Sequence, residues 1–234
     1  MHGETLTITT PDGAFEALVR RPAQAGDRPA VVVIQEIFGV NHTMRQVADD
    51  LAALGYLAVV PDLFWRFEPG IELDDTKPEE LARAFELFPK VDVDKATDDV
   101  AATIAAVRSL AGCNGKVGAV GYCLGGLIAF LTATRTDADA VVSYYGVNID
   151  KFTPEAEKLA HPLLLHIAGE DQFVPPAAQE KIVADLKNHP QIEIARYPGR
   201  DHAFARKGGD GYHAADAEAA DARTEAFFKT HLGA

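Results

Sequence analysis

Residues Val117 to Ile128 read Val-Gly-Ala-Val-Gly-Tyr-Cys-Leu-Gly-Gly-Leu-Ile, and this stretch decides how the rest of the chain is interpreted. The apolar run 117–120 predicts a buried strand, and the apolar segment from Leu124 onward predicts a helix. Between them lies the pattern G-x-C-x-G, with Cys123 at its centre. The related pattern G-x-S-x-G marks a strained turn that lifts its central side chain above a sheet. We therefore expect Cys123 to be a nucleophile.

The same turn also predicts how the thiol would be activated and how the oxyanion of the reaction would be stabilised. The amide of Leu124 would point from the helix N-terminus toward a reacting carbonyl, and that helix end would also favour a thiolate. Two other interpretations compete with this one. A lone cysteine is more often an inert core thiol, and glycine-rich turns can bind phosphate. The glycines here match neither G-x-x-x-x-G-K-[ST] nor G-x-G-x-x-G, which argues against a phosphate site.

Composition narrows the class of protein. The 234 residues are 47% hydrophobic, which suits one α/β domain spanning 1–234. No basic start followed by an apolar run and no membrane-length segment occurs, so we expect a soluble, cytoplasmic protein. Cys113 and Cys123 form neither a disulfide framework nor a zinc pattern. The net charge of −13 excludes nucleic acid and anionic membranes as partners but leaves a small anionic substrate open.

Strand and helix patterns alternate along the chain. The segments around 6–8 and 15–19 flank a Pro-Asp-Gly turn and predict an antiparallel N-terminal hairpin. Strands are then expected at 30–34, 56–60, 117–120, 140–145, 163–168 and 192–197, with helices between them and a last helix at about 212–231. This order predicts a doubly wound, mostly parallel sheet.

One connection does not follow that alternation. Residues 61–78 show no clear period and are expected to form a long loop. Pro78 then opens a helix whose apolar stripe contains Leu81, Phe85 and Phe88. We expect this helix to cover one wall of a pocket.

Three residues predict a catalytic triad. Nucleophile Cys123, acid Asp171 and base His202 occur in that order, each directly after an expected strand, so all three can meet at one sheet edge. His202 would take or hold the thiol proton, and Asp171 would fix the imidazole tautomer. Asp201 is a rival acid, but adjacent residues rarely reach around one imidazole. His166 lies inside a strand and is expected to be a satisfied core residue.

Two further groups lie at the same edge. Glu36 follows the strand 30–34 directly, where open α/β sheets place their ligands. Tyr144 and Tyr145 end the strand 140–145, so they are expected at the same face, as contacts of the substrate.

The chain resembles the dienelactone hydrolases, or carboxymethylenebutenolidases, of the α/β-hydrolase superfamily over essentially its whole length. The segments that carry the resemblance are Gln35-Glu36-Ile37-Phe38-Gly39-Val40-Asn41, Pro61-Asp62-Leu63, Gly115-Lys116-Val117-Gly118, Gly121-Tyr122-Cys123-Leu124-Gly125-Gly126, Tyr144-Tyr145-Gly146, Phe173-Val174-Pro175 and His202-Ala203-Phe204-Ala205-Arg206. The resemblance implies hydrolysis of 4-carboxymethylenebut-2-en-4-olide to maleylacetate, a step of chloroaromatic breakdown, without cofactor or metal.

The resemblance also implies roles for particular residues. Glu36 would neighbour the resting thiol and, once displaced by substrate, help to generate the thiolate. Ile37 would supply a second oxyanion amide, and Phe38 would contact the substrate. Arg206 would pair with the substrate carboxylate. A second arginine is expected before the cysteine turn, and Arg83 is the nearest candidate. Ala203 stands where the resemblance predicts a serine.

The expected partner is thus a small lactone or ester, and the leading prediction is that it carries a carboxylate. A broader esterase acting on other small substrates is the alternative. A thiol protein that senses oxidants without turnover is the remaining class, and it would need Cys113 to resolve an oxidised Cys123. We expect a monomer, and a dimer stays open.

Overall fold

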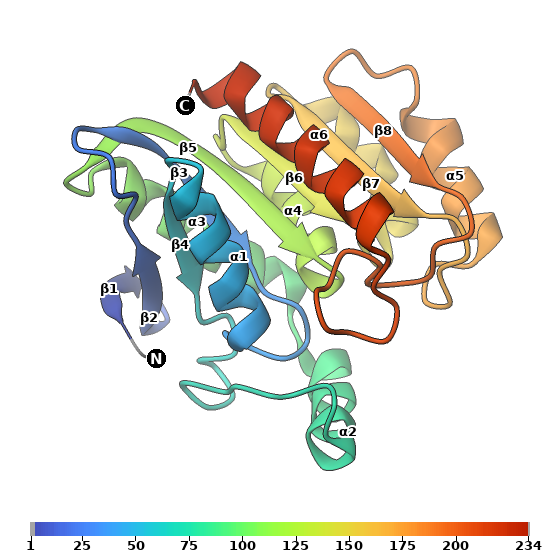
Figure 1. Ribbon diagram of the computed structural model, residues 1–234, viewed down its shortest axis with the longest axis horizontal. Coiled ribbons are helices and arrows are strands. Elements are labelled where there is room, and N and C mark those ends of the chain that lie inside the picture. The colour runs from blue at the N-terminus through green and yellow to red at the C-terminus, as the bar shows by residue number, and fades with distance from the viewer. Residues whose placement is uncertain (1–2, 234) are drawn as a thin grey trace.

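A mostly parallel sheet forms the centre of the computed structural model, which describes residues 3–233 (Figure 1). Its eight strands lie in the order β1-β2-β4-β3-β5-β6-β7-β8. The strands are β1 (Glu4–Thr10), β2 (Gly13–Arg20), β3 (Arg28–Ile34), β4 (Leu57–Pro61), β5 (Cys113–Tyr122), β6 (Ala140–Tyr144), β7 (Leu163–Ala168) and β8 (Ile192–Tyr197). The expected N-terminal hairpin and doubly wound sheet are confirmed.

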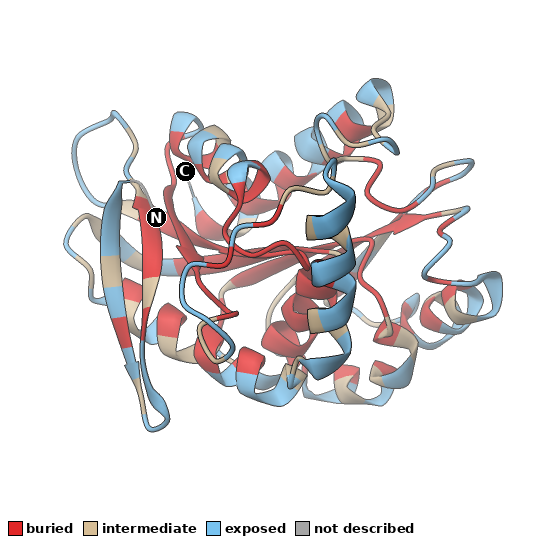
Figure 2. Ribbon diagram, turned by 90° about the horizontal axis from the view of Figure 1, so that it is seen from below, coloured by how far each residue is buried: buried red, intermediate tan, exposed pale blue. Residues whose placement is uncertain are grey.

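Pairing within the sheet follows the predicted pattern. β1 pairs with β2, and β2 with β4, in antiparallel orientation, whereas every pair from β4 to β8 is parallel. The parallel strands are long apolar runs because helices cover both of their sides. Figure 2 shows the result as a buried central sheet between helices whose outer surfaces are exposed.

Two groups of helices cover the sheet. The α-helices are α1 (His42–Ala53), α2 (Pro78–Leu87), α3 (Val93–Arg108), α4 (Leu124–Arg135), α5 (Pro176–Leu186) and α6 (Ala214–Leu232). Apolar residues of α1 and α6 join one core cluster, and those of α3, α4 and α5 join the other. α2 stands apart from both layers, below the sheet in Figure 1.

Some boundaries differ from the sequence predictions. β5 begins at Cys113, ahead of the strand expected at 117–120, because Cys113 pairs with Arg28 beyond an irregularity in the β3–β5 register. Phe88, expected in the helix opened by Pro78, instead begins a short 3-10 helix, Phe88–Lys90, and two more 3-10 helices, Ile149–Lys151 and Thr153–Lys158, occupy segments in which no helix was predicted. They are too short to show a hydrophobic period.

The loop 62–77 is tied to the end of β3. The buried carboxylate of Asp62 accepts hydrogen bonds from the amides of Phe64 and Gly70. Further along, the Leu73 amide donates to the Phe38 carbonyl, at 2.8 Å. The loop after β3 and the loop before α2 therefore pack together, at the edge where the parallel strands end.

Candidate active site

Cys123 occupies the turn between β5 and α4. Its backbone has φ 56° and ψ −116°, a conformation that residues other than glycine rarely adopt. Its amide donates to the Tyr144 carbonyl, and its carbonyl accepts from Gly126 and Leu127 in the first turn of α4. The surrounding chain thus holds the strained backbone in place. The side chain is half-buried and lines a cavity at the carboxyl ends of the strands.

The glycines of this turn are required by close packing. A Cβ on Gly121 would overlap the Gly125 carbonyl, and one on Gly125 would lie 2.5 Å from the Gln35 carbonyl oxygen. A Cβ on Gly126 would lie 2.6 Å from the Gly146 Cα. The N-terminus of α4 is therefore pressed against the ends of β3 and β6.

His202 and Asp171 form a buried pair beside Cys123. His202 Nδ1 and Asp171 Oδ2 are 2.8 Å apart, and both side chains are almost fully buried. The other oxygen of Asp171 accepts from the amides of Phe173 and Val174, at 2.8 and 3.2 Å. The carboxylate is thus fixed by its own loop before it orients the imidazole.

The rival acid, Asp201, does a different job. Its Oδ1 accepts from the amides of His202 and Gln172, and its Oδ2 accepts from the Gln172 side chain. It joins the two loops that carry the pair, but no hydrogen bond links it to the imidazole. The choice of Asp171 as the partner of the ring agrees with this geometry.

The second ring nitrogen faces the nucleophile. His202 Nε2 has no hydrogen-bond partner among the residues that the structure describes, and the sulfur of Cys123 lies outside hydrogen-bond geometry with it. Burial lowers the pKa of His202, but the nearby Cys123 sulfur and the bond to Asp171 outweigh it and raise the pKa to about 10. The site therefore favours an imidazolium beside the sulfur.

Two backbone amides at the site are free. In the described part of the chain, neither the Leu124 amide nor the Ile37 amide donates a hydrogen bond to protein. Leu124 opens α4, and Ile37 follows the end of β3 next to Glu36. Both belong to turns packed around Cys123, as the contact of Gly125 with the β3 end shows.

A buried cluster of charges adjoins the thiol. Arg206 Nη1 lies 2.9 Å from Asp75 Oδ2 and 3.7 Å from Glu36 Oε2. Glu36 is 2% exposed, and its Oε2 makes no hydrogen bond to any described residue. Burial raises the pKa of Glu36, although Arg206 and His202 oppose the shift. The Arg206 guanidinium also lies over the Phe38 ring, 5.2 Å from its centroid.

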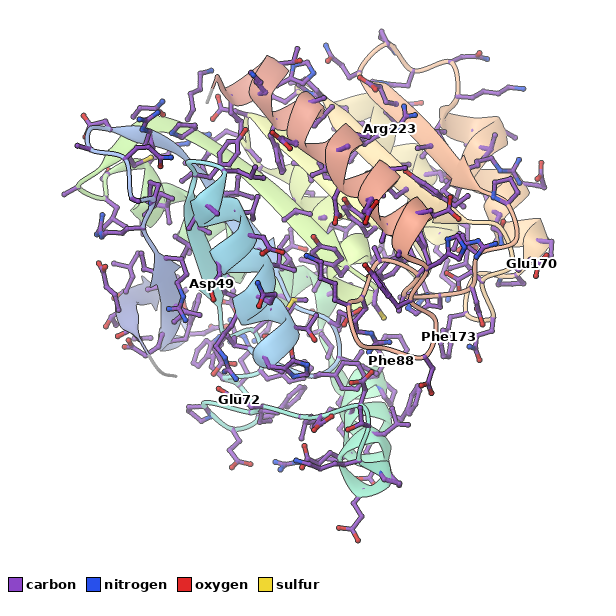
Figure 3. The ribbon with its side chains drawn as sticks, viewed as in Figure 1. Asp49, Glu72, Phe88, Glu170, Phe173 and Arg223 are labelled. Atoms are coloured by element: carbon purple, nitrogen blue, oxygen red, sulfur yellow. The ribbon has the colours of Figure 1, made fainter. Side chains whose placement is uncertain are left out.

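The cavity over Cys123 has a volume of about 680 Å³. One wall is apolar and comes from α2 and the residue after it: Leu81, Phe85 and Phe88. Phe173 faces that wall from the loop after β7, with its ring centroid 6.2 Å from that of Phe85. Figure 3 labels Phe88 and Phe173 near each other where α2 approaches this loop. The predicted apolar stripe of α2 does line the pocket.

Two expected substrate contacts are corrected by the structure. Arg83 does not line this cavity; it is half exposed and pairs with Glu68 at 2.6 Å, because its position on α2 faces away from the stripe. Tyr144 lines a different cavity, between α1 and α6, because its side chain points to the opposite face of the sheet.

A third expected substrate contact, Tyr145, is also corrected by the structure, whereas the expectation for His166 is confirmed. Tyr145 is buried behind the site, with its ring centroid 5.0 Å from that of His202, so it supports the imidazole rather than lining the cavity. His166 is a core residue, as expected: Nδ1 lies 2.8 Å from the Tyr197 hydroxyl and Nε2 3.0 Å from the Thr224 hydroxyl. Burial lowers the pKa of His166 to about 3.

Sequence reasoning assigned no role to two residues of this site. Asp75 pairs with Arg206, and the acidic Asp74-Asp75 pair in the loop before α2 was its only signal. Phe173 lies in a segment that carried the resemblance, yet nothing in its pattern indicated a contact across the cavity to α2. The Phe85–Phe173 contact joins residues 88 apart in the chain, and the Asp75–Arg206 contact joins residues 131 apart.

Neither a metal site nor a membrane span was found in the described part of the chain. No group of three or more histidine, cysteine, aspartate or glutamate side chains within residues 3–233 could hold a metal ion. No helix in that range combines the length and the apolar character needed to cross a membrane.

The strand order, the strained turn before α4 and the acid and histidine loops define an α/β-hydrolase fold. The dienelactone hydrolase family model matches residues 15–232, and the chain belongs to that family. It is accordingly a carboxylic ester hydrolase, as expected from its sequence.

Named relatives cover nearly the whole chain. A protein of Azospirillum brasilense, provisionally named a carboxymethylenebutenolidase, is 49% identical over 95% of this chain and 96% of its own. The carboxymethylenebutenolidase of Pseudomonas putida is 39% identical over 94% and 93%. A crystal structure from Klebsiella pneumoniae, provisionally titled a dienelactone hydrolase, has a TM-score of 0.83 at 29% identity, covering 96% of this chain and 97% of that one.

Proposed function

We propose that this protein hydrolyses small enol-lactones and esters through a thioester formed on Cys123. The observation that carries the proposal is the His202–Asp171 pair, whose free Nε2 faces a half-buried thiol on a strained turn. A thiolate is a far better nucleophile than a thiol, and an adjacent imidazolium favours it.

The chemical steps follow from the groups around the sulfur. The Cys123 thiolate attacks the substrate carbonyl carbon, and the oxyanion that forms is held by the Leu124 and Ile37 amides. The carbon–oxygen bond to the leaving group then breaks, and His202 gives its proton to the departing oxygen. Water next attacks the thioester while His202 takes a proton from it. The acid is released, and the thiolate and imidazolium return.

Glu36 and Arg206 would prepare the sulfur for substrate. In the resting site, the buried Glu36 carboxyl is held near the Arg206 guanidinium. A carboxylated substrate would compete with Glu36 for Arg206, and the displaced carboxylate would then be able to take the proton of any Cys123 that is still in the thiol form. Substrate binding would in this way add to the thiolate that the His202 imidazolium already favours. A carboxylated enol-lactone, as the name of the Pseudomonas putida relative implies, fits this role.

A second substrate class, uncharged aryl or alkyl esters, is favoured by the composition of the cavity. Arg206 is already paired with two carboxylates, and Asp201 and Asp210 also line the cavity. The facing wall is apolar, and Arg83 does not reach the site. Such surroundings repel a further carboxylate, that of a substrate, and accommodate an uncharged apolar group.

The test compares a carboxylated enol-lactone with a small uncharged aryl ester. Cys123→Ala is expected to abolish hydrolysis of both, because no other group can form the thioester. Arg206→Ala is expected to raise KM for the lactone by about tenfold or more while changing KM for the ester much less. Equal loss on both substrates would contradict the role of Arg206. Full activity of Cys123→Ala would contradict the mechanism.

A further inference from the structure

A second cavity, of about 540 Å³, lies between α1 and α6. Both helices lie in front of the same face of the sheet in Figure 1. The side chains of Tyr122, from β5, and Tyr144, from β6, line it from the sheet. It shares no lining residue with the cavity over Cys123. Its size falls within the range of small-molecule sites.

Tyr122 lines this cavity with an unused hydroxyl. Its side chain is 9% exposed, and its ring stacks on that of Tyr144 with centroids 4.8 Å apart. No residue in the described range 3–233 hydrogen-bonds to the Tyr122 hydroxyl. By contrast, the Tyr144 hydroxyl bonds to Asp221 and Thr224, at 3.0 and 2.7 Å. Because Tyr122 lines the cavity and its hydroxyl has no protein partner there, a ligand that enters the cavity can hydrogen-bond to it.

The cavity carries an excess of negative charge. Asp50, Asp221 and Glu225 all line it. The facing ammonium is that of Lys207, and it is paired with Asp50 at 2.8 Å. Burial, and then the charge of Asp221, raise the pKa of Tyr122, as expected where the potential is negative.

We propose that this cavity binds a small organic cation, an ammonium group carried on an aromatic or aliphatic body. The ammonium would donate to the free oxygen of Asp221 and to the Tyr122 hydroxyl. The body would pack against apolar lining residues such as Leu51 and Phe228. A cation near tyrosine rings gains further attraction from their faces.

The chain segments that line this cavity also hold the active site. Tyr122 directly precedes Cys123, and Lys207 directly follows Arg206. The Cys123 amide donates to the Tyr144 carbonyl at 3.1 Å. An occupant would therefore touch the segments that position the nucleophile and the guanidinium, from the opposite side.

Isothermal titration calorimetry with 2-phenylethylamine tests the proposal directly. This amine is protonated at about pH 7.5. The matched probe is 2-phenylethanol, which has the same body without the charge. The amine is expected to bind about tenfold or more tightly than the alcohol, since a hydrogen bond to a charged partner is the stronger one. Equal affinities would overturn the proposal.

Variants locate the binding. Asp221→Asn, which keeps the shape of the side chain, is expected to lower the affinity for the amine by about tenfold. Tyr122→Phe is expected to lower it by about threefold. Val47→Trp, which fills the cavity from α1, is expected to remove binding. Glu218→Gln is the matched control, because it removes the same charge from α6 outside the cavity. Unchanged affinity in Asp221→Asn and Val47→Trp would refute the site.

Kinetics separate the two cavities. The amine is expected not to compete with an aryl ester in hydrolysis, because the cavities have no residue in common. Competitive inhibition with an inhibition constant equal to the Kd measured by calorimetry would place the amine over Cys123 and refute the proposal. The calorimetric test needs no turnover, so its failure leaves the proposed hydrolysis untouched.

Discussion

Two neighbouring acids differ in what they do to His202. Asp171 accepts from the imidazole itself, whereas Asp201 accepts only from the His202 backbone amide and from Gln172. One sets the tautomer and charge of the ring, and the other joins two loops. Substitutions that keep side-chain shape should therefore separate these tasks.

Asp171→Asn is expected to lower kcat roughly a hundred- to ten-thousandfold, because the amide cannot support an imidazolium. Asp201→Asn, the matched control, is expected to lower kcat by less than about tenfold, because an amide oxygen can still accept from the backbone. Steady-state hydrolysis of an aryl ester measures both. Similar losses in the two variants would contradict the assignment of Asp171.

The protonation of His202 gives a pH prediction. Its pKa rises from the ordinary 6.5 to about 10 on folding, so its contribution to stability is complete below the ordinary value and disappears as the pH rises to about 10. NMR titration of the ring should show a protonated His202 at pH 8 (~1.5 units above the ordinary value). Asp171→Asn and Cys123→Ala should each lower this pKa, since both partners raise it. Unchanged titration in both variants would contradict the geometry.

Among the secondary-structure elements, α4 depends most on close approach. Its first turn lies against the ends of β3 and β6. At Gly125 the gap accommodates the two hydrogens of glycine but not a methyl group. This contact places the free Leu124 amide and the Cys123 side chain together at the cavity.

Gly125→Ala is expected to destabilise the protein by about 3 kcal/mol, because the added carbon would overlap two backbone carbonyls that cannot move aside. Gly209→Ala is the control: its added carbon would come no closer than 3.2 Å to another residue, at Arg206 Nε, and a cost below about 1 kcal/mol is expected. Urea unfolding measures both. A Gly125→Ala variant as stable as wild type would contradict the described packing.

α2 contributes the apolar wall of the cavity, and Ala84 is its one buried residue. Its Phe85 is 45% exposed. Phe85→Ala is expected to raise KM for an uncharged aryl ester roughly fivefold and to leave kcat and stability nearly unchanged, because the ring packs on substrate rather than on the core. Glu86→Ala, on the same helix outside the cavity, should change neither constant. A fall in kcat alone would indicate another role for this helix.

The whole molecule carries a formal net charge of −13. Repulsion among surface carboxylates destabilises a compact chain, and salt screens it. Raising sodium chloride from about 0.05 to about 0.5 M is expected to raise Tm by roughly 3 °C, which is about 1 kcal/mol at this size. Scanning calorimetry measures the change. A lower Tm in salt would show that attractive ion pairs outweigh the repulsion.

Local patterns in the sequence were sufficient for the sheet and its order of elements. Buried parallel strands are continuous apolar runs, and in the helices between them apolar residues recur every three to four positions. Both patterns can therefore be recognised without long-range information. The start of β5 could not be predicted, because Cys113 joins the strand only by pairing with Arg28, a residue of a distant segment.

The sequence by itself determined the fold and the family, because strand and helix patterns and short motifs can be recognised locally. It also determined the candidate nucleophile, acid and base, because each lies in a short segment at the end of a strand. Tertiary structure alone decided which side chains share a cavity. It paired Asp75 with Arg206, turned Arg83 to the surface and directed Tyr144 to the opposite face. These outcomes depend on side-chain direction and on contacts between distant segments, which no local pattern encodes.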